Sequence, residues 1–173
     1  MPRFVIALQN WDDRLVLDIV NHRKRSLDSW MLFVTQLGDG WFWLLLSLLI
    51  ILFDPTGWHT AIFPLAFGFL LEIPLYGVLK QSFSRPRPYQ IRDDVCCLRK
   101  PSDQFSFPSG HTSAAFVVLT VIAGIYSWLF LPLVVLAVTI AASRVYLGVH
   151  YPSDVLAGAL LGFCCGNFAL WIF

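Results

Sequence analysis

The amino-acid sequence predicts an all-α fold: a polytopic membrane helix bundle of about five transmembrane helices, preceded by an N-terminal amphipathic helix. Hydrophobic residues make up 57% of the 173 residues and charged residues only 13%, against about 25% in soluble domains. The mean hydropathy is +0.68. Apolar segments, several of them near the roughly 20 residues that cross a bilayer, alternate with charged connections. A net charge of +1 offers no basic surface, so no nucleic-acid partner is expected.

Residues 1–30 form a first segment that is more polar than the rest. Apolar residues recur in it at helical spacing, with glutamine and aspartate between them: Phe4, Leu8, Trp11, Leu15 and Ile19. This pattern predicts an amphipathic helix that is too polar to cross a bilayer comfortably. Two placements fit it equally well, a position in the membrane interface or packing against the helix bundle. The membrane domain is expected over residues 31–173.

The membrane domain divides into apolar segments that turn residues separate. Those expected to be helical are residues 41–53, 59–79, 112–127, 129–146 and 152–171. The first is too short to cross a bilayer, so its span has to include a short helix that ends at Leu37, across a bend at Gly38-Asp39-Gly40. Glu72 and Pro74 are expected to interrupt the segment 59–79. Glu72 is expected to face the bundle interior, since an acidic group is costly in lipid. Small residues along one side of the last segment predict close helix packing.

Charged residues lie where the apolar segments end. Lys80 closes the segment 59–79. His111 opens the next one, after a polar loop of 30 residues that begins at Gln81, and loops of that length in small domains are usually functional. Successive spans cross the membrane in opposite directions, so Arg144 returns to the same side as Lys80. The charged ends are therefore predicted to meet on one face of the membrane.

Three cations in this set suit the binding of phosphate. Arg87 and Arg144 can each hold two phosphate oxygens, and Lys80 adds a point charge. The hydroxyl of Ser109 and the backbone N–H groups from Gly110 onward lie at the start of a helix. Unpaired N–H groups and the positive end of the helix dipole favour an anion there.

Two histidines are candidates for phosphoryl transfer at such a site. Asp154 lies four residues after His150, a spacing that lets its carboxylate accept the imidazole Nδ1–H and leaves Nε2 free to attack phosphorus. His111 has no carboxylate at such a spacing, so it is the better candidate for the general acid. The predicted catalytic residues are thus His150, His111 and Asp154. No metal-binding motif accompanies them, and neither a metal nor another cofactor is expected.

The spacing of these residues resembles the three signature motifs of the type 2 phosphatidic acid phosphatase (PAP2) family, the membrane lipid phosphate phosphatases. The family pattern is Lys-x6-Arg-Pro, then Pro-Ser-Gly-His, then Ser-Arg-x5-His-x3-Asp, and every fixed position is present between Lys80 and Asp154. The resemblance implies that a phosphohistidine forms on His150, oriented by Asp154, and that His111 protonates the leaving group and then activates water. It also implies that the phosphate is held by Lys80, Arg87, Ser109, Gly110 and Arg144.

A second Arg-Pro pair, Arg85 and Pro86, precedes the one that fits the pattern. Only Arg87 has six residues between it and Lys80. Arg85 is expected to be a loop charge or a contact for the substrate headgroup.

The predicted function is that of an integral membrane hydrolase that removes phosphate from a lipid phosphate or diphosphate. Undecaprenyl diphosphate is the favoured substrate, because compact relatives with this pattern are often bacterial, and phosphatidic acid or phosphatidylglycerol phosphate is the alternative. Two other classes remain open. Vanadate-dependent haloperoxidases share the phosphate-binding residues but are soluble. A non-catalytic membrane adaptor would have little use for the pair of His150 and Asp154.

The expected location is the cell membrane (the inner or plasma membrane), which the chain crosses several times. The basic connector 23–25 and the loop 81–110 lie on the predicted active-site side, and the positive-inside rule would place that side in the cytoplasm. Phosphate binding is a better explanation for several of these cations, and the resemblance implies the outer face. The active site is therefore expected on the outer face.

Overall fold

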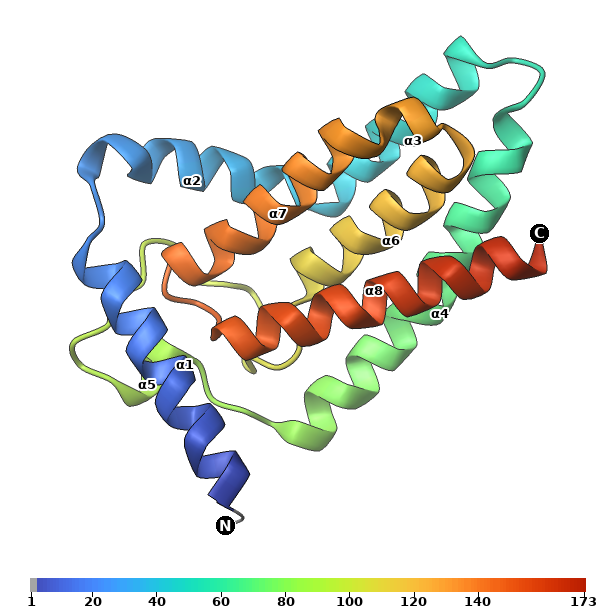
Figure 1. The fold of residues 1–173 in the computed structure, drawn as a ribbon. Coiled ribbons are helices and arrows are strands. Elements are labelled where there is room, and N and C mark those ends of the chain that lie inside the picture. Colours follow the sequence, from blue (N-terminus) through green and yellow to red (C-terminus); the bar gives the residue numbers. More distant parts are fainter. Residues whose placement is uncertain (1–2) are drawn as a thin grey trace.

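The computed structural model describes residues 3–173, which fold into a bundle of helices (Figure 1). The long helices are α1 (Arg3–Asn21), α2 (Arg25–Leu37), α3 (Gly40–Phe53), α4 (Trp58–Phe83), α6 (Gly110–Ile125), α7 (Phe130–Tyr146) and α8 (Pro152–Ile172). Two shorter elements complete the chain: α5 (Pro88–Ile91) in the α4–α6 loop and a 3₁₀ turn, η1 (Ser127–Leu129). The predicted all-α membrane bundle is confirmed.

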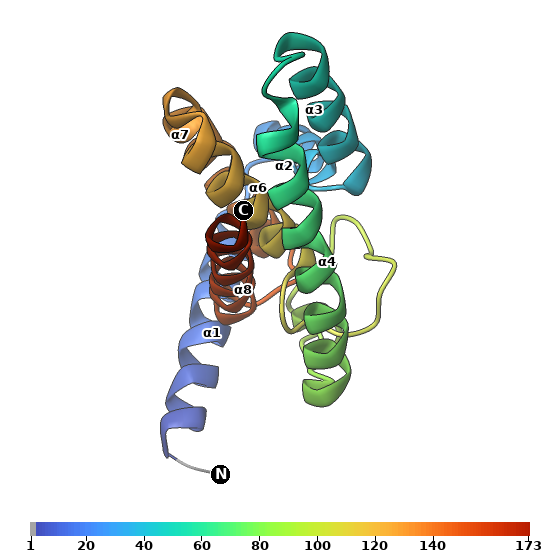
Figure 2. The same cartoon turned by 90° about the vertical axis from the view of Figure 1, so that its right-hand side faces the viewer.

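Helix α6 lies at the centre of the bundle, with α4, α7 and α8 around it (Figure 2). It contributes more residues to the main buried core than any other helix, among them Val117, Val121 and Ile122. Small residues let α8 approach it closely. A Cβ atom at Gly158 would lie 2.5 Å from the carbonyl oxygen of Ser109, so only glycine fits at this contact. The close packing predicted for the last segment is therefore present, and it joins the start of α6 to the start of α8.

Among residues 3–173, three helical segments are long and apolar enough to cross a membrane: α4 with α5 (Trp58–Ile91), η1 with α7 (Ser127–Tyr146), and α8 (Pro152–Ile172). Helices α2 and α3 pass the same test only together, as a pair bent by 61° around Gly38 and Asp39. The predicted break in the first span is thus present, and the pair makes a fourth candidate span. The fifth predicted span is α6, which has 16 residues and would extend only about 24 Å. Its central position accounts for its length, because the surrounding helices shield it from lipid.

Helix α4 is longer and more continuous than the sequence predicts. It runs from Trp58 to Phe83 with Pro64 and Pro74 inside it. The expected interruption at Pro74 is absent, because the helix passes through this residue. A proline in a membrane helix is tolerated because neighbouring groups satisfy the freed carbonyl. As a result the last turn of α4 carries Lys80 beyond the apolar segment and into the site.

Helix α1 packs against α7 and α8 and also carries exposed apolar side chains. Its buried residues are Asp12 and Val16, whereas Phe4 is 74% exposed. Both predicted placements therefore have some support, since one side of the helix contacts the bundle and another is apolar and free. The proposed boundary after residue 30 falls inside α2, and residues 1–2 of the first segment lie outside the described residues.

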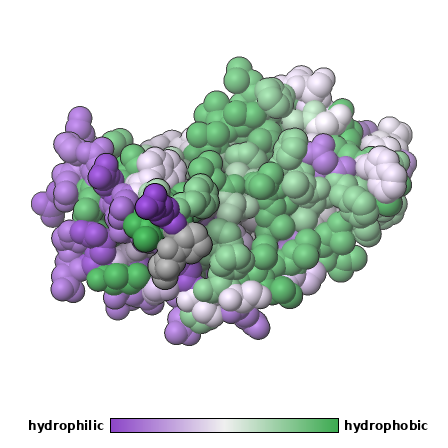
Figure 3. All heavy atoms as spheres, turned by 60° about the horizontal axis from the view of Figure 1, so that its bottom comes forward, coloured by the Kyte–Doolittle hydropathy of each residue, from purple (hydrophilic) through white to green (hydrophobic). Residues whose placement is uncertain are grey.

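Polar side chains gather at one end of the molecule (Figure 3). That end holds α1, α5 and the α4–α6 loop, and on the face shown in Figure 3 hydrophobic side chains dominate the middle of the molecule (Figures 1 and 3). The C-terminal ends of α4 and α7 and the N-terminal ends of α6 and α8 are at this polar end (Figure 1). The predicted meeting of the charged helix ends is confirmed.

Candidate active site

A small polar pocket of about 250 Å³ opens where these helix ends converge. Its lining comes from the α2–α3 break, the α4–α6 loop, α6 and α7: Asp39, Arg99, Lys100, Pro101, Ser102, Asp103, His111 and Arg144. Lys80, Arg87 and His150 lie behind this lining and are at most 7% exposed. All the predicted site residues are therefore in one place, most of them withdrawn from solvent.

The imidazole of His150 faces Arg87. The guanidinium Nη1 of Arg87 lies 3.2 Å from His150 Nε2 and donates to the carbonyl of Val149 at 2.7 Å. An arginine N–H can only donate, so Nε2 is the unprotonated nitrogen and carries a lone pair toward the cations. Burial, reinforced by the charges of Arg144 and Arg87, lowers the pKa of His150 well below its usual value. The ring is therefore neutral at pH 7 and suited to nucleophilic attack.

The turn between α7 and α8 sets the direction of His150. Gly148 has φ +73°, a left-handed conformation that glycine adopts without strain. The backbone N–H groups of Val149 and His150 both donate to the carbonyl of Arg144 at 3.3 Å. This tight reversal brings His150 back beside the end of α7, next to Arg144.

Asp154 lies behind the imidazole but does not form the predicted hydrogen bond with it. Its Oδ2 atom is 3.6 Å from His150 Nδ1 and accepts the backbone N–H of Tyr151 at 2.8 Å. Among residues 3–173, Nδ1 has no hydrogen-bond partner. The other oxygen, Oδ1, accepts from Arg85 at 2.7 Å. The Tyr151 N–H and Arg85 thus donate to the carboxylate oxygens to which the imidazole was predicted to donate. The carboxylate nevertheless remains the anion nearest to the ring.

Arg144 reaches the pocket from the last turn of α7 and is 5% exposed. Its Nη1 donates to the hydroxyl of Thr35 on α2 at 2.5 Å. Its buried Nε has no hydrogen-bond partner among the described residues. A side chain held at one nitrogen with donors to spare is suited to binding an oxyanion.

A carboxylate of the loop, Asp103, bonds to two of the three cations that are predicted to hold phosphate. It accepts from Arg87 Nη2 at 2.9 Å and from Lys80, and the hydroxyl of Tyr76 donates to it at 3.0 Å. Burial would raise the pKa of Asp103, but Lys80 and Arg87 outweigh that effect and lower it to about 2. Asp103 is therefore an anion held by the cations predicted to hold phosphate.

Ser109 and Gly110 occupy the start of α6, as predicted, but the Ser109 hydroxyl points to a neighbour. It pairs with the hydroxyl of Thr112 at 3.0 Å. The backbone N–H of Ser109 donates to the carbonyl of Asp154 at 3.0 Å, which ties the start of α6 to α8. Gly110 has no room for a side chain, because a Cβ atom there would lie 2.9 Å from the ring of Tyr76.

His111 has a carboxylate partner that the sequence spacing could not show. Its Nε2 atom lies 2.9 Å from Oδ1 of Asp39, in the break between α2 and α3. The side chain of His111 is 30% exposed, in contrast to the 2% of His150. Both histidines therefore have a nearby aspartate, and what distinguishes them is burial. His150 faces buried cations, and His111 lies at the mouth of the pocket.

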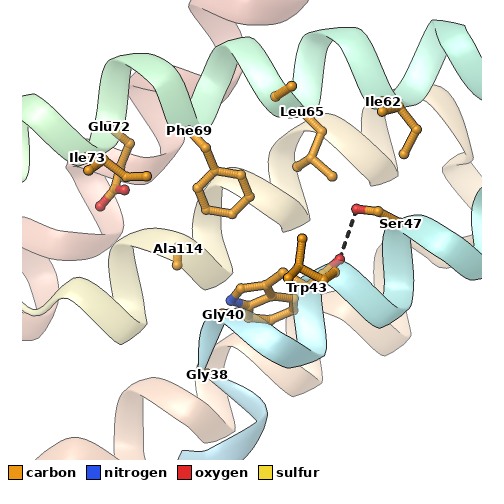
Figure 4. Close-up of a pocket in the computed structure, with 12 residues that line it drawn as sticks. Gly38, Gly40, Trp43, Ser47, Ile62, Leu65, Phe69, Glu72, Ile73 and Ala114 are labelled. Carbon is orange, nitrogen blue, oxygen red and sulfur yellow. Dashed lines mark hydrogen bonds between the residues drawn. The ribbon is translucent and has the colours of Figure 1, made fainter.

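An apolar cavity of about 600 Å³ lies between α3 and α4, on the other side of the α2–α3 break. Trp43, Leu65 and Phe69 line it, with Glu72 and Ala114 at one end (Figure 4). Glu72 is 4% exposed, so it faces the interior as predicted. The two compartments adjoin, because Gly38 and Gly40 line the cavity whereas Asp39 between them lines the polar pocket.

The other sequence predictions at this site have mixed outcomes. Arg85 lies in the α4–α6 loop as expected, and its guanidinium binds two buried carboxylates, those of Asp154 and Asp12. Sequence reasoning did not identify Tyr76, Asp39 or Asp103 as members of the site. Among residues 3–173, no group of three or more His, Cys, Asp or Glu side chains is arranged to hold a metal ion.

Comparisons with known proteins identify the family. The sequence pattern of the PAP2 superfamily matches residues 61–173. The chain is 30% identical over 150 residues to an undecaprenyl-diphosphatase of Sulfolobus acidocaldarius, covering 83% of this chain and 70% of that one. Its fold matches the crystal structure of LpxE from Aquifex aeolicus with a TM-score of 0.82 and 34% identity, over 91% of this chain and 93% of the other.

A second solved structure agrees with the first. The transmembrane PAP2-type phosphatidylglycerolphosphate phosphatase of Bacillus subtilis superposes with a TM-score of 0.81 at 31% identity, covering 96% of this chain and 86% of that one. Long matches at this level of identity establish common descent as well as a common fold. The chain therefore belongs to the PAP2 superfamily of membrane lipid phosphatases.

Proposed function

We propose that the protein hydrolyses undecaprenyl diphosphate to undecaprenyl phosphate and inorganic phosphate, through a phosphohistidine on His150. The observation that carries this proposal is the contact between two compartments of opposite character. A polar pocket with a buried neutral histidine adjoins an apolar cavity at Gly38–Gly40. A substrate with a charged head and a long hydrocarbon chain matches this arrangement. The relative from Sulfolobus acidocaldarius, named as an undecaprenyl-diphosphatase, supports the choice of lipid.

In the first step, the terminal phosphate takes the place of the Asp103 carboxylate on Lys80 and Arg87. Arg144 supplies further N–H donors from the opposite side of the pocket. The lone pair of His150 Nε2 attacks phosphorus, and a P–N bond forms as the P–O bond to the leaving lipid phosphate breaks. The cations stabilise the charge that develops on the phosphoryl oxygens.

His111 is proposed to give its proton to the leaving oxygen. Its place at the mouth of the pocket, beside the α2–α3 break, is where the lipid side of the substrate would lie. Asp39 favours the protonated imidazole and fixes the ring by accepting from Nε2. In the second step, the same imidazole takes a proton from water, which attacks the phosphohistidine and releases phosphate.

The apolar cavity is proposed to receive the first part of the hydrocarbon chain. Its wall residues, such as Trp43 and Phe69, come from the two helices that face each other across it (Figure 4). Leu44 and Ile73, which also line it, are 74% and 61% exposed, so the cavity is open on its lipid side. A lipid could therefore enter from the membrane without leaving it.

Phosphatidylglycerol phosphate is the alternative substrate, because the superposed Bacillus subtilis protein bears that name. The deciding experiment measures kcat/KM for phosphate release from undecaprenyl diphosphate, phosphatidylglycerol phosphate and phosphatidic acid in one detergent. We expect the highest value for undecaprenyl diphosphate. A higher value for either glycerolipid would replace the proposed substrate and leave the proposed chemistry in place.

A further inference from the structure

Arg85 joins helix α1 to the aspartate behind the proposed nucleophile. Its Nη1 donates to Asp154 Oδ1 and to the hydroxyl of Ser153, each at 2.7 Å. Its Nη2 donates to Asp12 Oδ2 at 2.8 Å and to the Gln9 side chain at 2.9 Å. One guanidinium therefore links two helices that are far apart in the sequence.

The partner on α1, Asp12, is itself firmly held. It is 0% exposed, although it belongs to a helix whose apolar residues are largely in contact with solvent or lipid. The backbone N–H of Ser153 donates to Asp12 Oδ1 at 2.9 Å, and the Ser153 hydroxyl donates to Oδ2. Asp12 thus caps the start of α8 from outside and holds Arg85 at the same time.

The ring of Tyr151 packs against the guanidinium of Arg85 and restricts its movement. The guanidinium carbon lies 4.1 Å from the centre of the Tyr151 ring. The backbone N–H of the same residue donates to Asp154 Oδ2. Both oxygens of Asp154 are therefore occupied by groups that Asp12, Arg85 and the start of α8 hold in place.

Removing two carboxylates and one guanidinium from water costs free energy of folding, so a functional role would explain why the arrangement is kept. A buried ion pair that lacks one partner leaves an unpaired charge, which is strongly destabilising. Asp154 is 0% exposed and needs a nearby cation to remain ionised. Arg85 is that cation, and Asp12 keeps it oriented. Asp12 also lies outside residues 61–173, the part that matches the superfamily pattern.

We propose that Asp12 and Arg85 are positioning residues of the active site. Through them, α1 keeps the Asp154 carboxylate ionised and oriented, and Asp154 in turn fixes the orientation and the protonation of the His150 ring. The proposal rests on the proposed role of His150 as nucleophile. It gives the N-terminal helix a part in the chemistry, in addition to any contact with the membrane interface.

The charge of each residue has a predictable effect on the proton affinity of His150. The charged or titratable groups around it are Asp12 on α1, Lys80 on α4, Arg85, Arg87 and Asp103 in the α4–α6 loop, His111 on α6, Arg144 on α7, and Tyr151 and Asp154 at the start of α8. Removing the positive charge of Arg85 raises the pKa of His150. Removing the negative charge of Asp12 lowers it, because the charge of Arg85 is then less neutralised.

The test compares Arg85→Gln, Asp12→Asn and the double variant, with Asp18→Asn as a matched control on an exposed turn of α1. The assay offers 4-nitrophenyl phosphate, whose leaving group needs no proton, to the full chain in detergent, and kcat/KM for its hydrolysis is measured against pH. We expect the acid limb to move up by about half a pH unit or more in Arg85→Gln and down in Asp12→Asn. The double variant should lie between them.

The rates provide a second readout. In both single variants kcat should fall by about tenfold or more, while KM changes by less than about twofold, because Lys80 and Arg87 are untouched. Asp18→Asn should match the unmodified chain. Arg85→Lys keeps the charge, so its acid limb should stay in place while kcat falls, since a single ammonium cannot serve both carboxylates.

Shifts in the same direction, or no shift in either single variant, would overturn the proposal. So would kcat values equal to that of Asp18→Asn. If Arg85→Gln does not fold, Arg85→Lys and Asp12→Asn still decide the question. His150→Ala in the same assay separates this proposal from the proposed function, because only turnover in that variant would contradict the role of His150.

Discussion

The Nε2 atom of His111 lies 2.9 Å from Oδ1 of Asp39, although the two residues are 72 positions apart in the sequence. Asp39 lies in the break between α2 and α3, where the polar pocket and the apolar cavity meet. The break in the first span therefore has two consequences. It opens the apolar cavity to the site, and it brings a carboxylate to the proposed general acid.

Asp39→Asn is expected to reduce proton donation by His111. An amide stabilises the protonated imidazole less than a carboxylate does, so kcat for a lipid phosphate should fall by about tenfold or more. Turnover of 4-nitrophenyl phosphate, which has a good leaving group, should fall much less. Asp94→Asn, a change at an exposed loop aspartate, serves as the control. Equal losses with both substrates would show that Asp39 does not act through leaving-group protonation.

Asp103→Asn is expected to strengthen the binding of oxyanions. Lys80 and Arg87 bind the Asp103 carboxylate, and an incoming phosphate has to replace it. Without that charge, inhibition by orthovanadate or inorganic phosphate should become about threefold tighter or more. Inhibition constants measured at one pH and ionic strength decide this. Weaker inhibition in the variant would mean that Asp103 supports the cation arrangement and does not compete with phosphate.

Chelation of metal ions is expected to leave activity unchanged. The positive charge at the proposed phosphate site comes from Lys80, Arg87 and Arg144, so no metal ion is needed to neutralise the phosphoryl oxygens. Phosphate release should be the same before and after dialysis against EDTA. Activity that is lost with EDTA and restored by Mg²⁺ would contradict the proposed mechanism.

The membrane orientation is testable through Cys96. This cysteine is exposed in the α4–α6 loop, at the polar end that holds the active site. We propose that this end faces the outside of the cell membrane. A variant that keeps only Cys96 should then react with a membrane-impermeant maleimide in intact cells. Protection in intact cells, with labelling only after permeabilisation, would place the site in the cytoplasm.

Much of the fold could be predicted from the sequence because membrane helices satisfy their own backbone hydrogen bonds. The observed helices therefore begin or end close to the expected limits. Helix α4 begins after Gly57, α6 ends before Tyr126, and α8 begins after Tyr151. The continuity of α4 through Pro74 was not predicted, since it depends on how neighbouring helices surround the proline. The short helix α6 was predicted, since the expected segment 112–127 differs from it by two residues at each end.

The predicted site residues could be found because they fall within three short motifs of fixed spacing, such as the one that holds Arg144, His150 and Asp154. The contacts of Asp39, Asp103 and Asp12 could not, since each depends on a tertiary approach between distant segments. A turn of backbone at Tyr151 also draws Asp154 away from the predicted bond to the imidazole. Periodicity and motif spacing carry no information about such long-range contacts.

Trapping of the phosphoenzyme tests the central claim most directly. The full chain in detergent is mixed with undecaprenyl diphosphate labelled at its terminal phosphate, quenched in alkali within milliseconds to seconds, and mapped by peptide analysis. We expect base-stable, acid-labile label on the peptide that contains His150, and none in a folded His150→Ala variant. Label that remains in His150→Ala, or that maps to His111, would contradict the proposed nucleophile.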